Sequence, residues 1–332
     1  MGAIIFSRLE LLSALSEHAG YKAGVALNER LLRRHLPDHE DYLVGPRDQI
    51  IRVRAEKLDA MAAQLLFVLG NTPRPDAILV PGQDFMRRHM RDPEMMALFG
   101  RVTDIFKDIV DSHTGPGPID VTPLLIRARE LGLDAELLAL EFVNDLALKI
   151  HQSPFSSFRR IEWIDTVQLK DLFCSENLTT QYGEFLDQRF IDYLAQNFDD
   201  IDRMNWRQFE GLASEFFHRQ GLDVRLSQGR NDGGVDIRVW RPEQSGSTPP
   251  ALLIQCKRQK AAVGKVVVKA LYADILDERA ESGLVVTTCA LSPGAEKVCI
   301  ARAYPVAQAN RRTLKAWLEQ MRTPGTGVFL GI

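Results

Sequence analysis

The pattern of apolar residues changes near residue 204, and this change most restricts the fold that the chain can adopt. Residues 204–221, MNWRQFEGLASEFFHRQG, repeat aromatic and apolar side chains at helical spacing and stop at a glycine. Short runs rich in branched and aromatic residues follow, DVRLS, VDIRVW and ALLIQCK, each bounded by Gly, Pro or Ser. Helical patterns then alternate with GLVVTT and a short candidate strand, PVAQ. This order predicts a mixed sheet flanked by helices over residues 203–332.

Residues 1–200 have a helical pattern instead. SRLELLSALSEHAG, NERLLRRHL and DQIIRVRAEKLDAMAAQLLFVLG repeat apolar residues at three- and four-residue spacing, with Asn28 and Asp48 near the expected helix starts. Residues 112–123, SHTGPGPIDVTP, cannot continue a helix. We therefore predict an α+β multidomain protein, whose parts are a helical domain over 1–111, a linker over 112–123, a second helical segment over 124–200 and the mixed α/β domain.

Charge is distributed unevenly between these parts. Residues 1–202 carry 22 Lys and Arg against 32 Asp and Glu, whereas residues 203–332 carry 19 against 12. The net charge is thus −10 for the first part and +7 for the second. This asymmetry favours a basic module that faces a polyanion, although segregated charge can also aid solubility or hold two domains together.

Composition excludes several classes of protein. No apolar run approaches the roughly 18 residues that span a membrane, and an Arg and a Glu interrupt the N-terminus before a signal-peptide core could form. We therefore expect a cytoplasmic protein. Its four cysteines are scattered and no two of them form a CxxC motif, which favours reduced thiols over a disulfide framework or a zinc site.

Three polar residues stand in the apolar strand-like runs. Gln255 and Lys257 share one face of the expected strand because successive side chains alternate. Asp236 follows a Gly-Gly pair at the start of the preceding strand, where two chain segments can approach closely. If the two strands are neighbours, a carboxylate, an amide oxygen and an ammonium group converge.

This combination suits phosphodiester hydrolysis. Carboxylate and amide oxygens hold a hard divalent cation, and a lysine offsets the negative charge that develops on phosphate. Glu210, on the preceding amphipathic helix, is a candidate to supply another metal oxygen or to orient the water. Ordinary structural explanations also exist. Asp236 can cap a turn, Gln255 can satisfy a sheet edge and Lys257 can extend from a strand end. Glu210 can be a common exposed helix residue.

The same motifs resemble a known family. FE in the first helix, NDGGVD, QCKR, and VVTT followed by LSPGA resemble the Mrr-like catalytic domain of type IV restriction endonucleases, within the PD-(D/E)xK nuclease superfamily. The likeness covers about residues 203–320. It implies DNA cleavage with Mg²⁺, for which Mn²⁺ can substitute.

The resemblance also implies roles for individual residues. Asp236 corresponds to the central metal ligand and Lys257 to the catalytic lysine. Gln255 stands at the second acidic position, where this branch commonly has Gln, as a ligand or a water-orienting group, and Glu210 corresponds to the helix carboxylate. Asp232 matches a position in the same loop that is often acidic.

Five basic residues are candidates for contacts with DNA phosphates near this site, although each can equally be a solvated surface charge. They are Arg230, Arg258, Lys260, Lys265 and Lys269.

The leading hypothesis is a metal-dependent DNA endonuclease that acts as a restriction or anti-phage defence effector. Because residues 1–202 are acidic and show no winged-helix or zinc pattern, we expect them to sense a trigger, bind a protein partner or oligomerise rather than read DNA. A homodimer or higher oligomer would cut both strands, as would a monomer that nicks sequentially. The alternatives are an inactive DNA-binding or scaffolding protein with a nuclease fold, and a nuclease that also cuts RNA.

Overall fold

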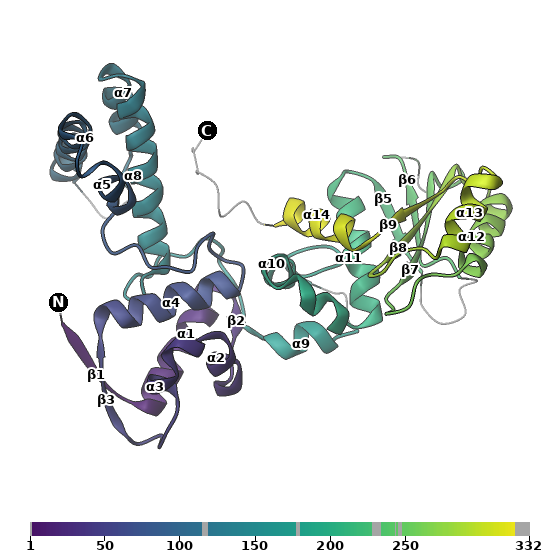
Figure 1. The fold of residues 1–332 in the computed structure, drawn as a ribbon, viewed down its shortest axis with the longest axis horizontal. Coiled ribbons are helices and arrows are strands. Elements are labelled where there is room, and N and C mark those ends of the chain that lie inside the picture. The colour runs from purple at the N-terminus through teal and green to yellow at the C-terminus, as the bar shows by residue number, and fades with distance from the viewer. Residues whose placement is uncertain are drawn as a thin grey trace.

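The computed structural model shows a helical N-terminal part and a sheet-containing C-terminal part, with α9 and α10 between them (Figure 1). It describes residues 2–114, 119–176, 180–227, 234–242, 244 and 248–322. Within these ranges, no helix has the length and apolar character needed to cross a membrane. The helical N-terminal region and the mixed sheet confirm the predicted fold class.

The first group of elements surrounds helix α1. It consists of β1 (Ala3–Ser7), α1 (Arg8–Ala23), β2 (Val25–Ala26), α2 (Glu29–His35), a 3-10 turn (Pro37–His39), α3 (Glu40–Leu43), β3 (Ile50–Arg54) and α4 (Ala55–Val68). Ser7 caps α1 through a reciprocal capping box with Glu10. Asn28 caps α2, as its position in the sequence predicted.

The predicted helix start near Asp48 is wrong. Residues 50–54 form β3, which pairs antiparallel with β1 so that Ile5 lies opposite Arg52, and α4 begins only at Ala55. Ile50, Ile51 and Val53 suit either period, and the pairing with a strand some 45 residues away decides between them. The spacing of apolar residues within this one segment therefore could not predict that it pairs with a distant strand.

A second group of helices has its own core and projects away from α1–α4 (Figure 1). It contains α5 (Gln83–His89), α6 (Pro93–Ser112), α7 (Thr122–Glu130) and α8 (Leu133–Gln152). Phe85, Leu98, Leu138 and Phe142 lie in this core. Of the predicted linker, residues 115–118 lie outside the described residues.

The central elements join the two parts of the chain. They are β4 (Val167–Gln168), which pairs parallel with β2, then α9 (Leu169–Cys174), α10 (Gln188–Gln196) and a 3-10 helix (Phe198–Arg203). Helix α10 contacts both α4 and α14 (Arg311–Met321), the last helix in the described ranges. The largest apolar core consequently extends from Leu66 of α4 through Phe190 of α10 to Leu318 of α14.

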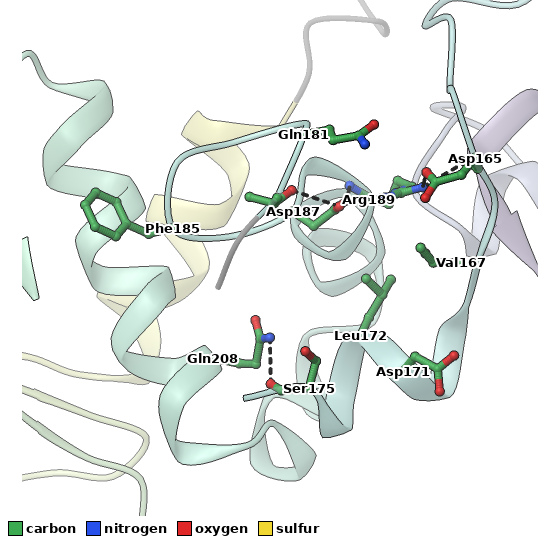
Figure 2. A pocket seen from close by; sticks show the side chains of 11 residues that line it. Asp165, Val167, Asp171, Leu172, Ser175, Gln181, Phe185, Asp187, Arg189 and Gln208 are labelled. Atoms are coloured by element: carbon green, nitrogen blue, oxygen red, sulfur yellow. Dashed lines mark hydrogen bonds and ion pairs between the residues drawn. The ribbon is translucent and has the colours of Figure 1, made fainter. Parts of the chain in front are cut away.

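A buried arginine reinforces this junction. The Arg189 guanidinium forms ion pairs with Asp187 at 2.8 Å and Asp165 at 3.2 Å (Figure 2). It also donates to the Gly24 carbonyl. A pocket of about 250 Å³ lies beside these residues, with Gln208 of α11 in its wall (Figure 2). Arg189 therefore connects the start of α10 to the residue that follows α1 and to a residue that precedes β4.

The C-terminal part is a five-stranded mixed sheet with helices on both faces. Its elements are α11 (Trp206–Arg219), β5 (Asp223–Leu226), β6 (Ile237–Trp240), β7 (Leu252–Lys257), α12 (Lys265–Glu278), β8 (Ser282–Thr287), α13 (Pro293–Ala301), β9 (Val306–Ala309) and α14 (Arg311–Met321). The strand order is β5-β6-β7-β8-β9. The first three strands are antiparallel, and β7, β8 and β9 are parallel.

The two faces of the sheet bury different residues of β7. Ile254 and Cys256 pack into the large core with α11 and α14, whereas Leu253 packs with α12 on the opposite face. This alternation places Gln255 and Lys257 on the α12 side of the strand. Glu210, which belongs to α11, approaches the same strand from the other side.

Candidate active site

Asp236 lies immediately before β6 and is held by the neighbouring strand. Because β6 pairs Ile237 with Ile254, Asp236 stands opposite Gln255. The Asp236 backbone N–H donates to the Ile254 carbonyl at 3.0 Å, and its Oδ2 accepts the Cys256 backbone N–H at 2.6 Å. A carboxylate that accepts a backbone N–H makes a strong, charge-assisted bond. The two strand ends thus determine where this carboxylate points.

Gln255 is buried, with only 6 % of its surface exposed. Its Nε2 donates to the Gly234 carbonyl at 2.9 Å, which fixes the orientation of the amide. Its Oε1 is buried and has no hydrogen-bond partner among the described residues. Because an unpaired buried acceptor costs about 1–3 kcal/mol, this oxygen is an acceptor that a bound ligand could satisfy.

The pKa of the Cys256 thiol depends on the charged groups near this end of β7. Burial raises its pKa well above the ordinary value, and the nearby carboxylates of Asp236 and Glu210 raise it further. The Lys257 ammonium acts in the opposite direction and lowers the thiol pKa. Two candidate carboxylates and the candidate lysine therefore lie within electrostatic range of one buried atom, next to Gln255.

Glu210 is buried rather than exposed, contrary to the interpretation of it as an ordinary surface residue. Its side chain is 9 % exposed, and its Oε2 accepts from Arg207 Nη1 at 2.9 Å. The same Arg207 nitrogen donates to the Ser227 carbonyl at 2.7 Å. Sequence reasoning missed Arg207, although its position three residues before Glu210 on a helix is a spacing that places two side chains together.

The donor set fits a hard divalent cation. No group of three His, Cys, Asp or Glu side chains in the described ranges could hold a metal ion. The candidate set instead combines the carboxylates of Asp236 and Glu210 with the amide oxygen of Gln255. Oxygen ligands of this kind suit Mg²⁺ and Mn²⁺, and the unpartnered Gln255 oxygen is the feature that favours such a ligand.

The predicted phosphate-contact residues have different surroundings. Lys260, Lys265 and Lys269 are exposed after β7 and at the start of α12. Arg258 is exposed and donates to the Asp202 carbonyl at 2.7 Å, so its guanidinium already has one partner. Arg230 lies outside the described residues, as does Asp232.

Comparison with known proteins identifies the domain that contains these residues. Residues 201–318 match the family model Mrr_cat, described as a restriction endonuclease. A curated relative, the uncharacterized protein y4cE of Sinorhizobium fredii (strain NBRC 101917 / NGR234), is 28% identical over 95 residues, which are 29% of this chain and 24% of that protein. The chain therefore spans about a quarter of the length of this relative.

Among solved structures, the MspJI restriction endonuclease in complex with a 27-mer oligonucleotide is 19% identical, with a TM-score of 0.30 over 62% of this chain and 46% of that chain. This likeness is too low to carry an argument about the site. The family match covers almost the range that the sequence motifs predicted and confirms the resemblance. Residues 201–318 are a restriction endonuclease domain of the Mrr_cat family.

Proposed function

We propose that this protein is a DNA endonuclease that hydrolyses phosphodiester bonds with the help of Mg²⁺ or Mn²⁺. One observation carries the proposal. Within the restriction endonuclease domain, the charges of Asp236, Glu210 and Lys257 all act on the Cys256 thiol of β7, and the adjacent Gln255 has a buried oxygen without a partner in the described structure.

Each of these side chains has a separate task in the proposed reaction. When bound, the cation would polarise the phosphate and acidify a water molecule. Asp236 and Gln255 are suited to hold it because the Cys256 N–H and the Gly234 carbonyl already orient them. The Lys257 ammonium offsets the negative charge that develops on the phosphate oxygens.

The distribution of charge supports DNA as the substrate. The part of the chain that contains this domain carries a net charge of +7, and three exposed lysines follow β7. Exposed basic groups beside a catalytic site attract and position a phosphate backbone. The lysines Lys260, Lys265 and Lys269 are the proposed phosphate contacts, together with Arg258 and Arg230.

The test is a cleavage assay with the full chain and supercoiled plasmid, in Mg²⁺, Mn²⁺ or EDTA. We expect metal-dependent nicking or linearisation by the unmodified protein and its loss in Asp236→Asn and Lys257→Ala. Lys297→Ala, which removes an exposed lysine on α13, is the matched control and should keep activity. Cleavage that persists in both site variants would contradict the assignment, as would a wild-type protein that neither cuts nor binds metal.

We further propose that the protein acts in restriction or anti-phage defence and that residues 1–200 control the nuclease. The acidic charge of that region and the Arg189 junction beside α11 support this role. Deleting the junction ion pairs with Arg189→Met should change cleavage without changing Mn²⁺ affinity. Assays on modified and unmodified DNA and on RNA, with light scattering for oligomeric state, test the substrate range and the proposed dimer.

A further inference from the structure

Arg207 contacts one candidate metal ligand, Glu210, and the residue that follows β5, Ser227. Its Nη1 donates both to Glu210 Oε2 at 2.9 Å and to the Ser227 carbonyl at 2.7 Å. The pair is largely withdrawn from solvent, since 18% of the arginine side chain and 9% of the glutamate side chain are exposed. An ion pair in this environment is screened much less than one on the surface.

Ser227 is in turn bonded to the segment that contains Asp236. Its backbone N–H donates to the Asp236 carbonyl at 2.9 Å, and its hydroxyl donates to the Val235 carbonyl at 2.6 Å. A movement of the Arg207 guanidinium would therefore release Glu210 and also free the carbonyl of a residue that is bonded to the segment containing Asp236.

A guanidinium on Glu210 opposes the binding of a divalent cation to the same carboxylate. Two positive groups a few ångströms apart in a partly buried site repel each other strongly. Arginine cannot relieve this repulsion by losing its proton, because its side chain stays charged in proteins. The Arg207 guanidinium must therefore stay beside the bound cation or leave Glu210 for another anion. A phosphate is a particularly good alternative partner, because the planar guanidinium can donate two parallel hydrogen bonds to it.

We propose that Arg207 lowers the affinity of the protein for divalent cations until a nucleic-acid phosphate draws its guanidinium away from Glu210. This inference rests on the proposed function and adds a regulation of the same site. By thermodynamic linkage, a substrate that displaces Arg207 strengthens metal binding, and the metal strengthens substrate binding by the same factor. Arg207 is thus a positioning residue that couples the two ligands.

The first test measures Mn²⁺ affinity without nucleic acid, by electron paramagnetic resonance of unbound Mn²⁺. We expect Arg207→Gln to bind Mn²⁺ about tenfold more tightly than the unmodified chain, because the competing charge is gone. Arg207→Lys keeps a charge and should show a smaller gain. An arginine that only orients Glu210 would give the opposite result, so weaker or unchanged binding in Arg207→Gln overturns the inference.

Arg203→Gln is the matched control. Arg203 also forms an ion pair at three-residue spacing, with Asp200 at 3.0 Å, but its side chain is 54% exposed and its partner is not a candidate ligand. Its Mn²⁺ affinity should equal that of the unmodified chain. Circular dichroism of each variant verifies that the fold is retained, and a gain in affinity cannot arise from unfolding.

The second test adds a short DNA duplex in a Lys257→Ala background, where the proposed nuclease leaves the duplex intact. The duplex should tighten Mn²⁺ binding when Arg207 is present and should have a much smaller effect when Arg207→Gln is added. Equal tightening in both proteins overturns the coupling.

The proposed function and this inference fail in different ways. If Asp236→Asn binds Mn²⁺ as well as the unmodified chain does, the proposed metal site is wrong and the inference falls with it. If Asp236→Asn loses Mn²⁺ binding but Arg207→Gln gains none, the metal site stands and only the role of Arg207 is refuted.

Discussion

Replacing Gln255 by methionine separates a ligand from a structural residue more clearly than any other change in the site. The amide donates from Nε2 to the Gly234 carbonyl at 2.9 Å, but its Oε1 is buried without a partner among the described residues. Methionine has nearly the same length and removes both polar atoms. If Gln255 serves metal binding, this substitution should not lower the stability of the fold but should abolish metal binding.

The expected magnitude follows from these two atoms. Removing the unpaired oxygen relieves a penalty of about 1–3 kcal/mol, whereas losing the Nε2 hydrogen bond costs about 0.5–1.5 kcal/mol. We therefore expect Gln255→Met to raise the free energy of unfolding in EDTA by about 1 kcal/mol. Gln208→Met is the matched control. Gln208 is also 6% exposed and donates to the Ser175 carbonyl at 2.8 Å, but it has no such buried unpaired oxygen.

Urea unfolding followed by circular dichroism measures both effects. In EDTA, Gln255→Met should be at least as stable as the unmodified chain, and Gln208→Met should be less stable. Added Mn²⁺ should stabilise the unmodified chain and Gln208→Met but not Gln255→Met, because only a protein that binds the ion in its folded state gains stability from it. A loss of more than about 2 kcal/mol in Gln255→Met without metal would show that its oxygen has a structural partner, which would refute the reasoning.

Three further predictions concern the fold. Burial is the main cause that lowers the pKa of His18 and His35 to about 4 and of His151 to about 3, so the unfolded chain takes up protons that the folded chain does not. Stability should fall as the pH decreases through the window from about 6.5 to about 4, by about 3 kcal/mol per histidine, and urea unfolding at several pH values should show a weaker dependence in His151→Gln. Glu215 accepts the backbone N–H groups of residues 184–186 and the Arg219 side chain, so Glu215→Ala should cost about 3–5 kcal/mol in urea unfolding, and a loss below about 1 kcal/mol would contradict a buried ionic contact. A Cβ on Gly70 would lie 1.9 Å from the Asp192 carbonyl oxygen at a φ of +77°, whereas one on Gly221, at +79°, would meet no atom within 4 Å. Gly70→Ala should therefore lower the melting temperature much more than Gly221→Ala, and equal losses would show that backbone strain alone matters.

The sequence by itself determined the period of most segments and the order of the sheet domain. The strands DVRLS, VDIRVW, ALLIQCK and GLVVTT became β5, β6, β7 and β8, because branched and aromatic residues between turn residues encode an extended backbone locally. Alternation along β7 also placed Gln255 and Lys257 on one face. The roles of the predicted site residues remain predictions.

Only the tertiary structure decided which of these segments meet. It made residues 50–54 a strand through pairing with β1, buried Glu210 beside Arg207, and set Asp236 against the Cys256 N–H. It also left Gln255 with a buried oxygen that no neighbour in the described structure satisfies. Such features depend on contacts between residues far apart in the chain, whereas a periodic pattern records only how one segment folds by itself.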